Sequence, residues 1–415
     1  MDVIHERCAG IDISKADVKV CIRVPGAGRR RRREVRTFST MTNDLLAMRD
    51  WLLVERVTVV GMEATGAYWK PVFYLLEHDM DCWLLNARHM KAVPGRKTDV
   101  KDAEWIAELV EHGLVRPSFV PPEPIRHLRD LTRYRTEIVR ERTREVQRLE
   151  KFLEDAGVKL SVAVSDLMGK SARAMLEALI AGERDPNVVA ELALGSLRGK
   201  RPILTQALTG RFTAHHAFLV RAMLDRIDAC VAMETRLSDQ IEQAVRPFRH
   251  QLDLIATIPG ASGRAAEVIL AEVGADPTRF PTAADLASWA GMCPGNNQSG
   301  ATNKPGRTRH GDPWLKAVLG QVAVSAARTK GTYLAARYRR IAGRRGKKRA
   351  LVAVGHSVLI AVWIMLTRDV AYHDLGAEHF VERLNPNAKA KQTRRLIDQL
   401  HQLGYNVTVH PTQAA

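Results

Sequence analysis

A proline-rich segment at residues 115–124, VRPSFVPPEP, separates two stretches of the chain whose patterns differ. Its four prolines cannot continue a helix, so we expect a linker there. Short runs rich in β-branched residues precede the linker, at 8–14, 18–24, 34–40, 57–63 and 82–86. Beyond it, apolar residues recur every three or four positions within long charged segments. This contrast predicts an α/β part followed by an all-α part.

The first part, residues 1–120, is predicted to form a mixed sheet with helices on its faces. Three strand runs follow one another and then alternate with helices, expected near 42–53 and 68–77. We expect Thr42 to cap the first of these helices. A further helix is expected in KTDVKDAEWIAELVEHG, with Thr98 as its cap and Gly113 at its end.

The second part, residues 121–250, reads as long helices. Apolar residues repeat at three and four from 125 to 153, and a cleaner pattern runs from 220 to 244. There, two heptad positions are apolar except at Glu234: Val220, Ile227 and Ile241 on one, and Met223, Cys230, Leu237 and Ala244 on the other. The pattern predicts a coiled coil or a long helical hairpin. Such helices pack within one chain or between two chains, and the 220–244 heptads are a candidate dimer seam.

The third part, residues 251–375, is predicted to be helical, and the tail at 376–415 adds one helix near 391–402 with no assigned function. The helices of the third part are expected near 262–273, 282–290, 313–328, 332–342 and 349–367. A polar loop at 291–313 interrupts them, and a loop of this length in a compact domain is typical of a functional segment or a disordered one.

The charge of the chain indicates a polyanionic partner. Lys and Arg number 63 against 46 Asp and Glu, a net charge of +17, which favours nucleic acid over a small metabolite. Aromatic residues make up only 6%, which favours recognition of backbone and shape over base stacking as the main mode. The candidate nucleic-acid-binding residues are Arg29, Arg30, Arg31, Arg32, Arg33, Lys304, Arg307, Arg309, Arg344, Arg345, Lys347 and Lys348.

Neither membrane insertion nor a cysteine framework is expected. The most apolar stretch, 351–366, is shorter than a bilayer span and contains Gly355, His356 and Ser357, so we interpret it as a core helix. The N-terminus lacks the pattern of a signal peptide. The five cysteines are far apart and form no CxxC pair, so no disulfide framework or zinc site is predicted. We expect a cytoplasmic protein.

Four acids stand out as candidate metal ligands. Asp12 lies inside a predicted strand, where an unpaired carboxylate would be costly to bury, and Glu63 ends another strand. Asp99 and Asp102 are three residues apart at a helix start and therefore share a face. If the four converge on one sheet edge, their oxygens suit Mg²⁺ and phosphoryl transfer. Taken singly, Asp99 and Asp102 also fit the first-turn acids that a helix dipole favours.

The polar loop holds a candidate nucleophile, Ser299, ahead of Lys304, Arg307 and Arg309. A serine hydroxyl among cations is suited to a phosphate site or to nucleophilic attack on phosphorus, although a serine in a loop is more commonly a solvated one. Upstream, IPGASG at 258–263 resembles the turn of a helix–hairpin–helix element, with Ser262 in place of its usual second glycine.

Several of these motifs together resemble one family. GIDISK, GMEATGAY and KTDVKDAEWIAELV are similar to the RuvC-like DEDD domain of the IS110-family transposases. The stretch from ATIPGASG through NNQSG to TKGTYLAARYR is similar to the C-terminal transposase domain of that family. The resemblance covers about residues 8–370, with the motifs in the family's order. It implies a RuvC/RNase H-like sheet at 1–120 and a serine transposase domain at 251–375.

The family is described as bridge-RNA-guided DNA recombinases. By this resemblance, Asp12, Glu63, Asp99 and Asp102 bind Mg²⁺, and Ser299 attacks DNA to form a transient phosphoserine link in a site composed of both domains. The implied partners are donor DNA, target DNA, a structured guide RNA and further copies of the chain in dimers and tetramers. Two other functions stay open at this point: a hydrolytic RuvC-like nuclease or junction resolvase, and a non-catalytic nucleic-acid-binding protein.

Overall fold

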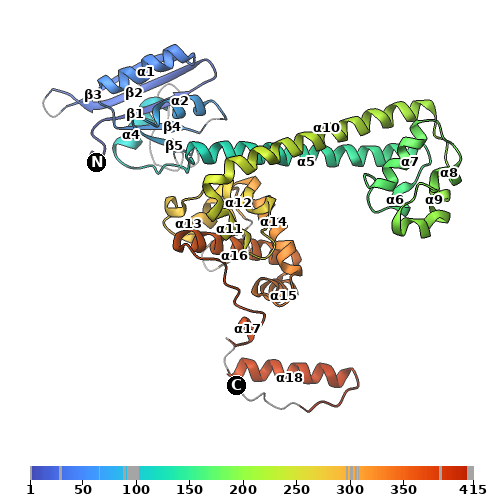
Figure 1. Ribbon diagram of the computed structural model, residues 1–415. Coiled ribbons are helices and arrows are strands. Elements are labelled where there is room, and N and C mark those ends of the chain that lie inside the picture. The colour runs from blue at the N-terminus through green and yellow to red at the C-terminus, as the bar shows by residue number, and fades with distance from the viewer. Residues whose placement is uncertain are drawn as a thin grey trace. The chain divides into compact units, whose positions relative to one another are not determined.

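The computed structural model divides the chain into two compact units, Met1–Pro121 and Pro122–Ala415, which we describe separately (Figure 1). The structure describes residues 2–27, 30–64, 66–86, 90, 102–295, 298–299, 302–303, 306, 308–382 and 386–408. The division lies within the proline-rich segment that the sequence marks as a linker.

Unit 1 is built on a mixed sheet. Its described strands are β1 (Cys8–Ile13), β2 (Asp17–Pro25), β3 (Arg31–Ser39), β4 (Val59–Glu63) and β5 (Asp81–Leu85). Their order across the sheet is β3-β2-β1-β4-β5. The first three strands form an antiparallel meander, and β4 and β5 run parallel to β1. The mixed sheet predicted from the β-branched runs is confirmed, and β3 begins earlier than expected, within the arginine run.

Helices cover both faces of this sheet. Alternate residues of β1, including Ile11, pack against α1 (Thr42–Val54) and α2 (Trp69–Leu76) in one apolar core. The opposite face packs against α4 (Asp102–Glu111), where Cys8 lies with Ile106 and Val110. Thr42 is not the cap that we expected: it is the first helical residue, and Met41 occupies the N-cap position. The predicted end of α4 at Gly113 is confirmed by that residue's φ of 62°.

Unit 2 opens with two long helices, α5 (Glu123–Asp155) and α10 (Ala214–Val245), that pack against each other along the chain (Figure 1). They run antiparallel, since Arg142 bonds Glu234 while Asp155, a helix end, meets His216. The apolar face of α10, including Ile227 and Ile241, is buried within this chain. The heptads therefore form a hairpin and not the dimer seam that we had considered.

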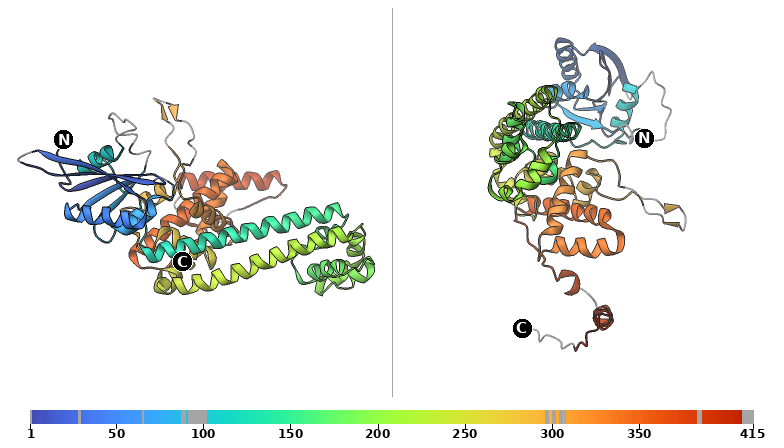
Figure 2. Two further views of the ribbon diagram at one scale, coloured as in Figure 1. Left: turned by 90° about the horizontal axis from the view of Figure 1, so that it is seen from above. Right: turned by 90° about the vertical axis from the view of Figure 1, so that its right-hand side faces the viewer.

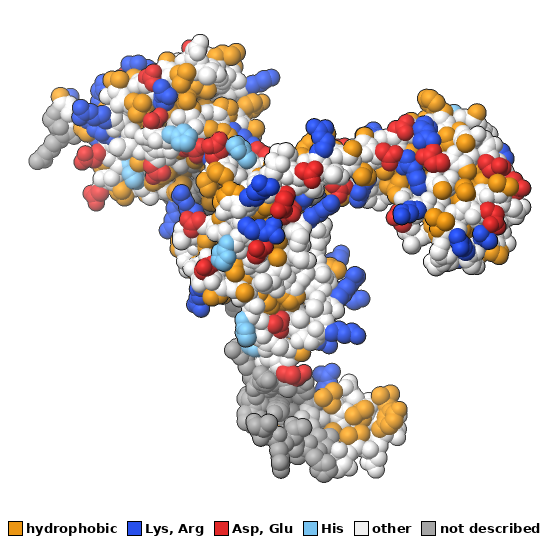
Figure 3. Space-filling model, in the orientation of Figure 1, with side chains coloured by type: hydrophobic (Ala, Val, Ile, Leu, Met, Phe, Trp, Pro, Cys, Tyr) orange, Lys and Arg blue, Asp and Glu red, His pale blue; other side chains and the backbone are white. Residues whose placement is uncertain are grey.

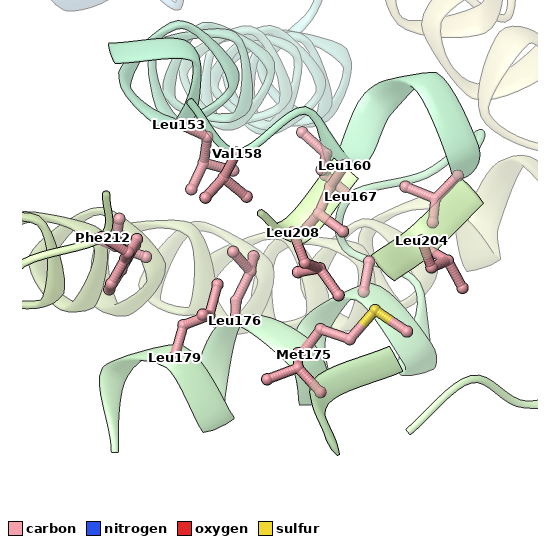
Figure 4. Close-up of a cluster of buried hydrophobic side chains, with 14 of the residues drawn as sticks. Leu153, Val158, Leu160, Leu167, Met175, Leu176, Leu179, Leu204, Leu208 and Phe212 are labelled. Atoms are coloured by element: carbon pink, nitrogen blue, oxygen red, sulfur yellow. The ribbon is translucent and has the colours of Figure 1, made fainter. Parts of the chain in front are cut away.

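A small helical subdomain joins the far ends of α5 and α10. It consists of α6 (Leu160–Ala163), α7 (Lys170–Ile180), α8 (Pro186–Ala190), a 3-10 turn (Gly195–Lys200) and α9 (Arg201–Leu208). Leu153, Met175, Leu176 and Leu204 point into a common core at this end (Figure 4). Burying each such side chain contributes about 1.5–3 kcal/mol, so this core fixes the turn between the long helices.

The remaining helices of unit 2 form a second helical body. It contains a 3-10 turn (Arg246–Phe248), α11 (Arg249–Ala256), α12 (Arg264–Val273), a second turn (Pro277–Arg279), α13 (Ala283–Trp289), α14 (Pro313–Arg328), α15 (Tyr333–Arg345) and α16 (Lys347–Arg368). The predicted helices all occur, with ends shifted by a few residues at most. Two further helices follow, α17 (His379–Glu382) and α18 (Pro386–Gln402).

Helix α16 contains the apolar stretch predicted to be a core helix. It is the one helix among the described residues that is long and apolar enough to cross a membrane by length and composition. Its Val354, Val358 and Leu359 have no exposed surface, and it contacts α11, α13, α14 and α15. Packing inside unit 2 thus explains the buried apolar residues of α16, whereas Val352 is exposed.

Candidate functional site

Two of the predicted acids end neighbouring parallel strands of unit 1. The register pairs Ile11 with Met62, and continuing it by one residue sets Asp12 beside Glu63. Paired residues of parallel strands point to the same face, and the strands lie about 4.8 Å apart. Both side chains are partly buried. The sheet therefore presents two carboxylates together at the carboxyl ends of β1 and β4.

Helix α4 brings a third acid to the same end of the sheet. It runs antiparallel to β1, because Gly10 lies against Ala103 and Ala107, whereas Cys8, two residues earlier on the strand, donates its Sγ–H to the carbonyl oxygen of Ala107. Its first residue, Asp102, therefore lies toward the end of β1 at which Asp12 stands. The face that α4 covers is the one to which Asp12 and Glu63 belong.

Glycines make this close packing of α4 possible. A Cβ on Gly10 would overlap the backbone of Ala103 and Ala107, and it would lie 2.9 Å from the Ala107 Cα. A Cβ on Gly61 would lie 3.2 Å from the Ile106 side chain. The motifs GID and GME thus place the glycine that admits the helix two residues before each acid.

The donor chemistry of this edge fits Mg²⁺, which prefers carboxylate oxygens. The residues that would hold it are Asp12, Glu63 and Asp102, and one oxygen of Asp102 is buried. The fourth predicted ligand, Asp99, lies outside the described residues. Within the residues described, no three His, Cys, Asp or Glu side chains are gathered into a metal-binding group, so the fit rests on residue type and placement.

Other acids of unit 1 have structural partners. Asp17 accepts a hydrogen bond from the Ser14 hydroxyl at 2.6 Å, and Glu104 pairs with Arg33 at 2.7 Å. Sequence reasoning missed Glu111, which is 1% exposed and accepts from Arg23 and Arg31 at 2.7 Å each. Burial opposes its charge, but these two guanidinium bonds outweigh it and lower the pKa of Glu111. The sequence did hold a signal for its burial. Glu111 follows Ala103 and Ala107 at intervals of four residues, which places it on the face of α4 that packs on the sheet.

The polar loop of unit 2 is a β-hairpin arm, with Ser299 close to its tip. Strand β6 (Gln298–Ser299) pairs antiparallel with β7 (Thr302–Asn303), and Ser299 stands opposite Thr302. A bridge between Pro294 and Thr308 continues the pairing toward the base. The views of Figure 2 show this small ribbon standing apart from the helices of its own unit. The arm presents a serine on a defined hairpin.

Close contacts between glycines hold the base of the arm together. A Cβ on Gly311 would overlap the Ala290 carbonyl, and one on Gly306 would overlap the Gly295 carbonyl. Gly291 adopts a positive φ of 68°, a conformation that glycine accepts without strain. The two legs of the arm therefore approach each other more closely than side chains would permit.

A buried ion cluster attaches the arm to the long helices. Asp312, at the end of the arm, caps α14 by accepting from the Trp314 and Leu315 backbone N–H groups at 2.8 Å each. Arg133 of α5 bonds Asp312 at 3.0 Å and also reaches Glu272 of α12 at 2.7 Å. Glu272 is fully buried. One guanidinium thus connects α5, α12 and the base of the arm.

Comparison with known proteins identifies the family. Residues 9–157 match the DEDD domain family of the IS110 transposases, which is described as a transposase. Residues 252–339 match the family described as "Transposase IS116/IS110/IS902 family". The chain is an IS110-family transposase. The two matches contain, respectively, the acidic sheet edge and the serine arm.

Named relatives of this transposase agree with the assignment. A "Probable family 20 transposase" of Pseudomonas aeruginosa is 26% identical over 322 residues, covering 76% of this chain and 85% of the relative. The "Transposase for insertion sequence element IS1111A" of Coxiella burnetii is 25% identical over 328 residues, covering 76% and 80%. An "Insertion element IS900 uncharacterized 42 kDa protein" of Mycobacterium paratuberculosis is 26% identical over 298 residues, covering 67% and 73%.

The arginine run of the transposase is largely engaged in unit 1. Arg31 is bonded to Glu111, Arg32 to Glu55 and Arg33 to Glu104. Arg30 is exposed, and Arg29 lies outside the described residues. These ion pairs give the strand β3 arginines a structural role beside the nucleic-acid contact predicted for them.

A second basic cluster of the transposase lies at the junction of α15 and α16. Arg344, Arg345, Lys347 and Lys348 are all exposed where α15 ends and α16 begins. Cations in the first turn of α16 oppose the helix dipole, so they do not stabilise that helix. Figure 3 shows Lys and Arg side chains along this part of unit 2. A bound phosphate backbone would offset their repulsion.

The remaining predicted cations and the hairpin turn also lie in unit 2. Arg309 is exposed at the base of the arm, whereas Lys304 and Arg307 lie outside the described residues. The IPGASG turn joins α11 to α12, as expected for a helix–hairpin–helix element, with Gly260 and Gly263 at φ values of 85° and 55°. Gly260 packs against α14, where a Cβ would lie 2.8 Å from the Ser325 side chain.

Proposed function

We propose that this transposase cuts and rejoins DNA through a transient phosphoserine at Ser299, with the acids of unit 1 supporting the reaction. The observation that carries the proposal is the placement of Ser299 near the tip of a glycine-based hairpin arm. The serine thus lies in a short two-stranded hairpin of the polar loop, in the sequence context that resembles the serine motif of the family.

The proposed step conserves bond energy. The Ser299 oxygen forms a bond to a DNA phosphorus, the bond from that phosphorus to the deoxyribose oxygen breaks, and the leaving oxygen takes up the proton that the serine lost. A hydroxyl of the partner strand then attacks the phosphoserine and restores the serine. Because each bond broken is replaced by an equivalent one, rejoining requires no nucleotide triphosphate.

The acids Asp12, Glu63 and Asp102, with Asp99, are proposed to hold Mg²⁺. When bound there, Mg²⁺ supplies electrostatic stabilisation to the charge that develops on the reacting phosphate. The chain's own contribution is to keep these carboxylates at one sheet edge, through the glycines under α4. We propose that the acids and the serine act on the same phosphate, within one chain or between copies.

The finer assignments are proposals that follow from the family. They are recognition of a structured guide RNA that pairs with donor and target DNA, assembly into dimers and tetramers, and a cytoplasmic location. Within the chain we propose four parts: a DEDD domain at 1–120, a helical region at 121–250, a serine transposase domain at 251–375 and a tail at 376–415. The exposed cations near 344–348 and the overall charge of +17 support contact with nucleic acid backbones.

Trapping of a covalent intermediate tests the reaction. The purified protein is incubated with guide RNA, DNA and Mg²⁺, denatured, and examined for DNA linked to protein. We expect an adduct that Ser299→Ala abolishes and that the matched control Ser288→Ala, an exposed serine of α13, retains. Nicked DNA without any adduct would instead establish a hydrolytic nuclease, and unchanged DNA would indicate a binding protein.

A further inference from the structure

A cavity in unit 2 lies outside the residues assigned above to the reaction. It is formed by α5, α12 and α14 and has a volume of about 290 Å³. This is close to the lower end of the range typical of small-ligand pockets, about 300–1,000 Å³. Its walls include Arg135 and Arg140 of α5, Arg264 of α12 and Trp314 of α14.

The charged side chains that line the cavity are all arginines. Three arginines line it, and among the described residues no acid does. Each arginine bonds a glutamate beyond the lining: Arg135 bonds Glu267, Arg140 bonds Glu137 and Arg264 bonds Glu234. A guanidinium carries five N–H donors in a planar fork, so one carboxylate does not use them all. The side chains of Arg140 and Arg264 are 45% and 57% exposed, which leaves room for an anion at the mouth.

The same cavity has an aromatic ring, Trp314, in its wall. The Arg140 guanidinium lies over the Trp314 ring, 5.0 Å from its centroid, and Arg133 lies 5.7 Å from it. The backbone of Trp314 is fixed at the start of α14, because its N–H donates to Asp312 at 2.8 Å. Val139, Val268 and Val318 add apolar surface to the walls. A planar ring with an attached anion matches this combination better than a purely apolar or a purely ionic ligand does.

We propose that this cavity binds one unpaired DNA nucleotide, with its base against Trp314 and Arg140 and its phosphate at Arg264. A base can enter only when it is not paired, since a base inside a duplex is covered on both of its faces. The arm that carries Ser299 ends at Asp312, two residues before Trp314, so the cavity lies at the base of the arm. The site and the arm thus belong to the same part of unit 2.

The choice of DNA rests on the proposed strand exchange, because cutting and joining leave unpaired nucleotides next to the exchanged phosphate. The cavity itself is defined by distances and charges that do not depend on the reaction. The test therefore uses Ser299→Ala protein, in which no covalent chemistry is expected, and measures binding alone. Failure of the phosphoserine proposal and failure of this one are then separate results.

Binding of a fluorescein-labelled 12-nucleotide single strand, a length on the order of the site sizes known for single-strand-binding folds, is measured by anisotropy in the Ser299→Ala protein. We expect Trp314→Ala to weaken binding about tenfold or more, the effect of losing one stacked base. Trp314→Phe keeps a ring and should lose less. Arg140→Gln should lose about three- to tenfold, since a charge-assisted phosphate or stacking contact is removed. The matched control is Arg144→Gln, an exposed arginine one turn along α5 that does not line the cavity.

Three results would overturn the proposal. The first is equal single-strand affinity for Trp314→Ala and its parent. The second is an equal loss of affinity, in the same variants, for a blunt duplex of the same sequence, which would indicate that the cavity attracts DNA by charge alone and does not select an unpaired base. The third is a Trp314-dependent effect seen with the RNA version of the strand and absent with DNA. Trp314→Ala removes a partly buried ring, so the melting temperature of this variant is measured as well. If it unfolds, Arg140→Gln still tests the proposal, because Arg140 is exposed.

Discussion

Asp12 and Glu63 stand side by side at the ends of parallel strands β1 and β4, one residue beyond the pair formed by Ile11 and Met62. Two carboxylates in this relation repel each other unless a cation lies between them. Their placement side by side at one sheet edge therefore suits a metal-assisted reaction.

Removing either charge should abolish strand cleavage and leave the fold intact. We expect Asp12→Asn and Glu63→Gln to reduce covalent adduct formation by about 100-fold or more, since loss of a metal ligand removes several kcal/mol of transition-state stabilisation. The melting temperature should stay the same or rise, because a like-charge contact is relieved. Adduct formation and thermal unfolding are measured on the same preparations.

The matched control for these variants is Asp17→Asn. Asp17 lies on the neighbouring strand β2. Its carboxylate accepts from the hydroxyl of the nearby Ser14, and its backbone N–H donates to the same hydroxyl. It should retain full adduct formation. Equal loss in Asp17→Asn, or full activity in Asp12→Asn, would contradict the assignment of the sheet edge.

The approach of α4 to the sheet depends on Gly10. We expect Gly10→Ala to lower the free energy of unfolding by about 1–3 kcal/mol, as overpacking of a rigid backbone contact does. It should also reduce adduct formation, because Asp102 begins the helix that is displaced. Chemical denaturation followed by circular dichroism measures the first effect.

Gly320→Ala is the comparison for this substitution. Gly320 lies inside α14, where a Cβ would meet nothing within 4 Å. Alanine there should stabilise the protein by up to about 1 kcal/mol through helix propensity. If Gly10→Ala behaves like Gly320→Ala, α4 does not pack on the sheet as described.

The sequence predicted the strands and helices better than it predicted the hairpin arm, and the difference has a physical reason. The strands were found because β-branched runs have a strong local signal, and α14 was found from Pro313 to Arg328 because its apolar spacing is regular. Where the hairpin arm lies, the sequence predicts only a long polar loop, because the pairing of the arm depends on contacts between glycines about 10–20 residues apart, such as Gly291 with Gly311.

The role of Glu234 could not be predicted from the sequence of α10. It interrupts the apolar heptads of α10, and the structure explains it by bonds from Arg142 of α5 and Arg264 of α12. Both partners lie far away in the sequence, so no pattern within α10 reveals them. The same holds for Asp102, whose place beside β1 depends on the packing of α4.

The base of the arm should control the presentation of Ser299. Gly311→Ala places a methyl group against the Ala290 carbonyl and forces the two legs of the arm apart. We expect adduct formation to fall by about tenfold or more, the effect of misplacing a reacting group by about 1 Å. The melting temperature should also fall, because the added methyl group meets backbone atoms as closely as it does in Gly10→Ala, so adduct yield is measured at a temperature at which the variant is folded. A normal adduct yield in Gly311→Ala would show that the arm base is not a positioning element.

Unit 1 should lose stability in acid through Glu111. Its folded pKa is below the ordinary value of 4.5, so its contribution is fully present above that pH and is lost as the pH falls through the lowered value. We expect the free energy of unfolding to decline as the pH is lowered below about 4.5, and Glu111→Gln to be less stable at neutral pH with a shallower decline. The basic groups facing it are Arg23, Arg31 and His112. An unchanged slope in Glu111→Gln would contradict this role.

The buried cluster around Glu272 should be the most sensitive ionic site of unit 2. Glu272→Ala leaves Arg129 and Arg133 without the carboxylate that both approach, at 3.1 Å and 2.7 Å. Removing one partner of a buried ion pair typically costs about 3–5 kcal/mol, because the remaining charge stays in a poorly solvated place. We expect a loss of that size by chemical denaturation. The control Glu242→Ala breaks an exposed pair with Arg249 and should cost about 1 kcal/mol or less. Similar losses in the two variants would mean that the cluster is solvated and does not attach the arm to α5.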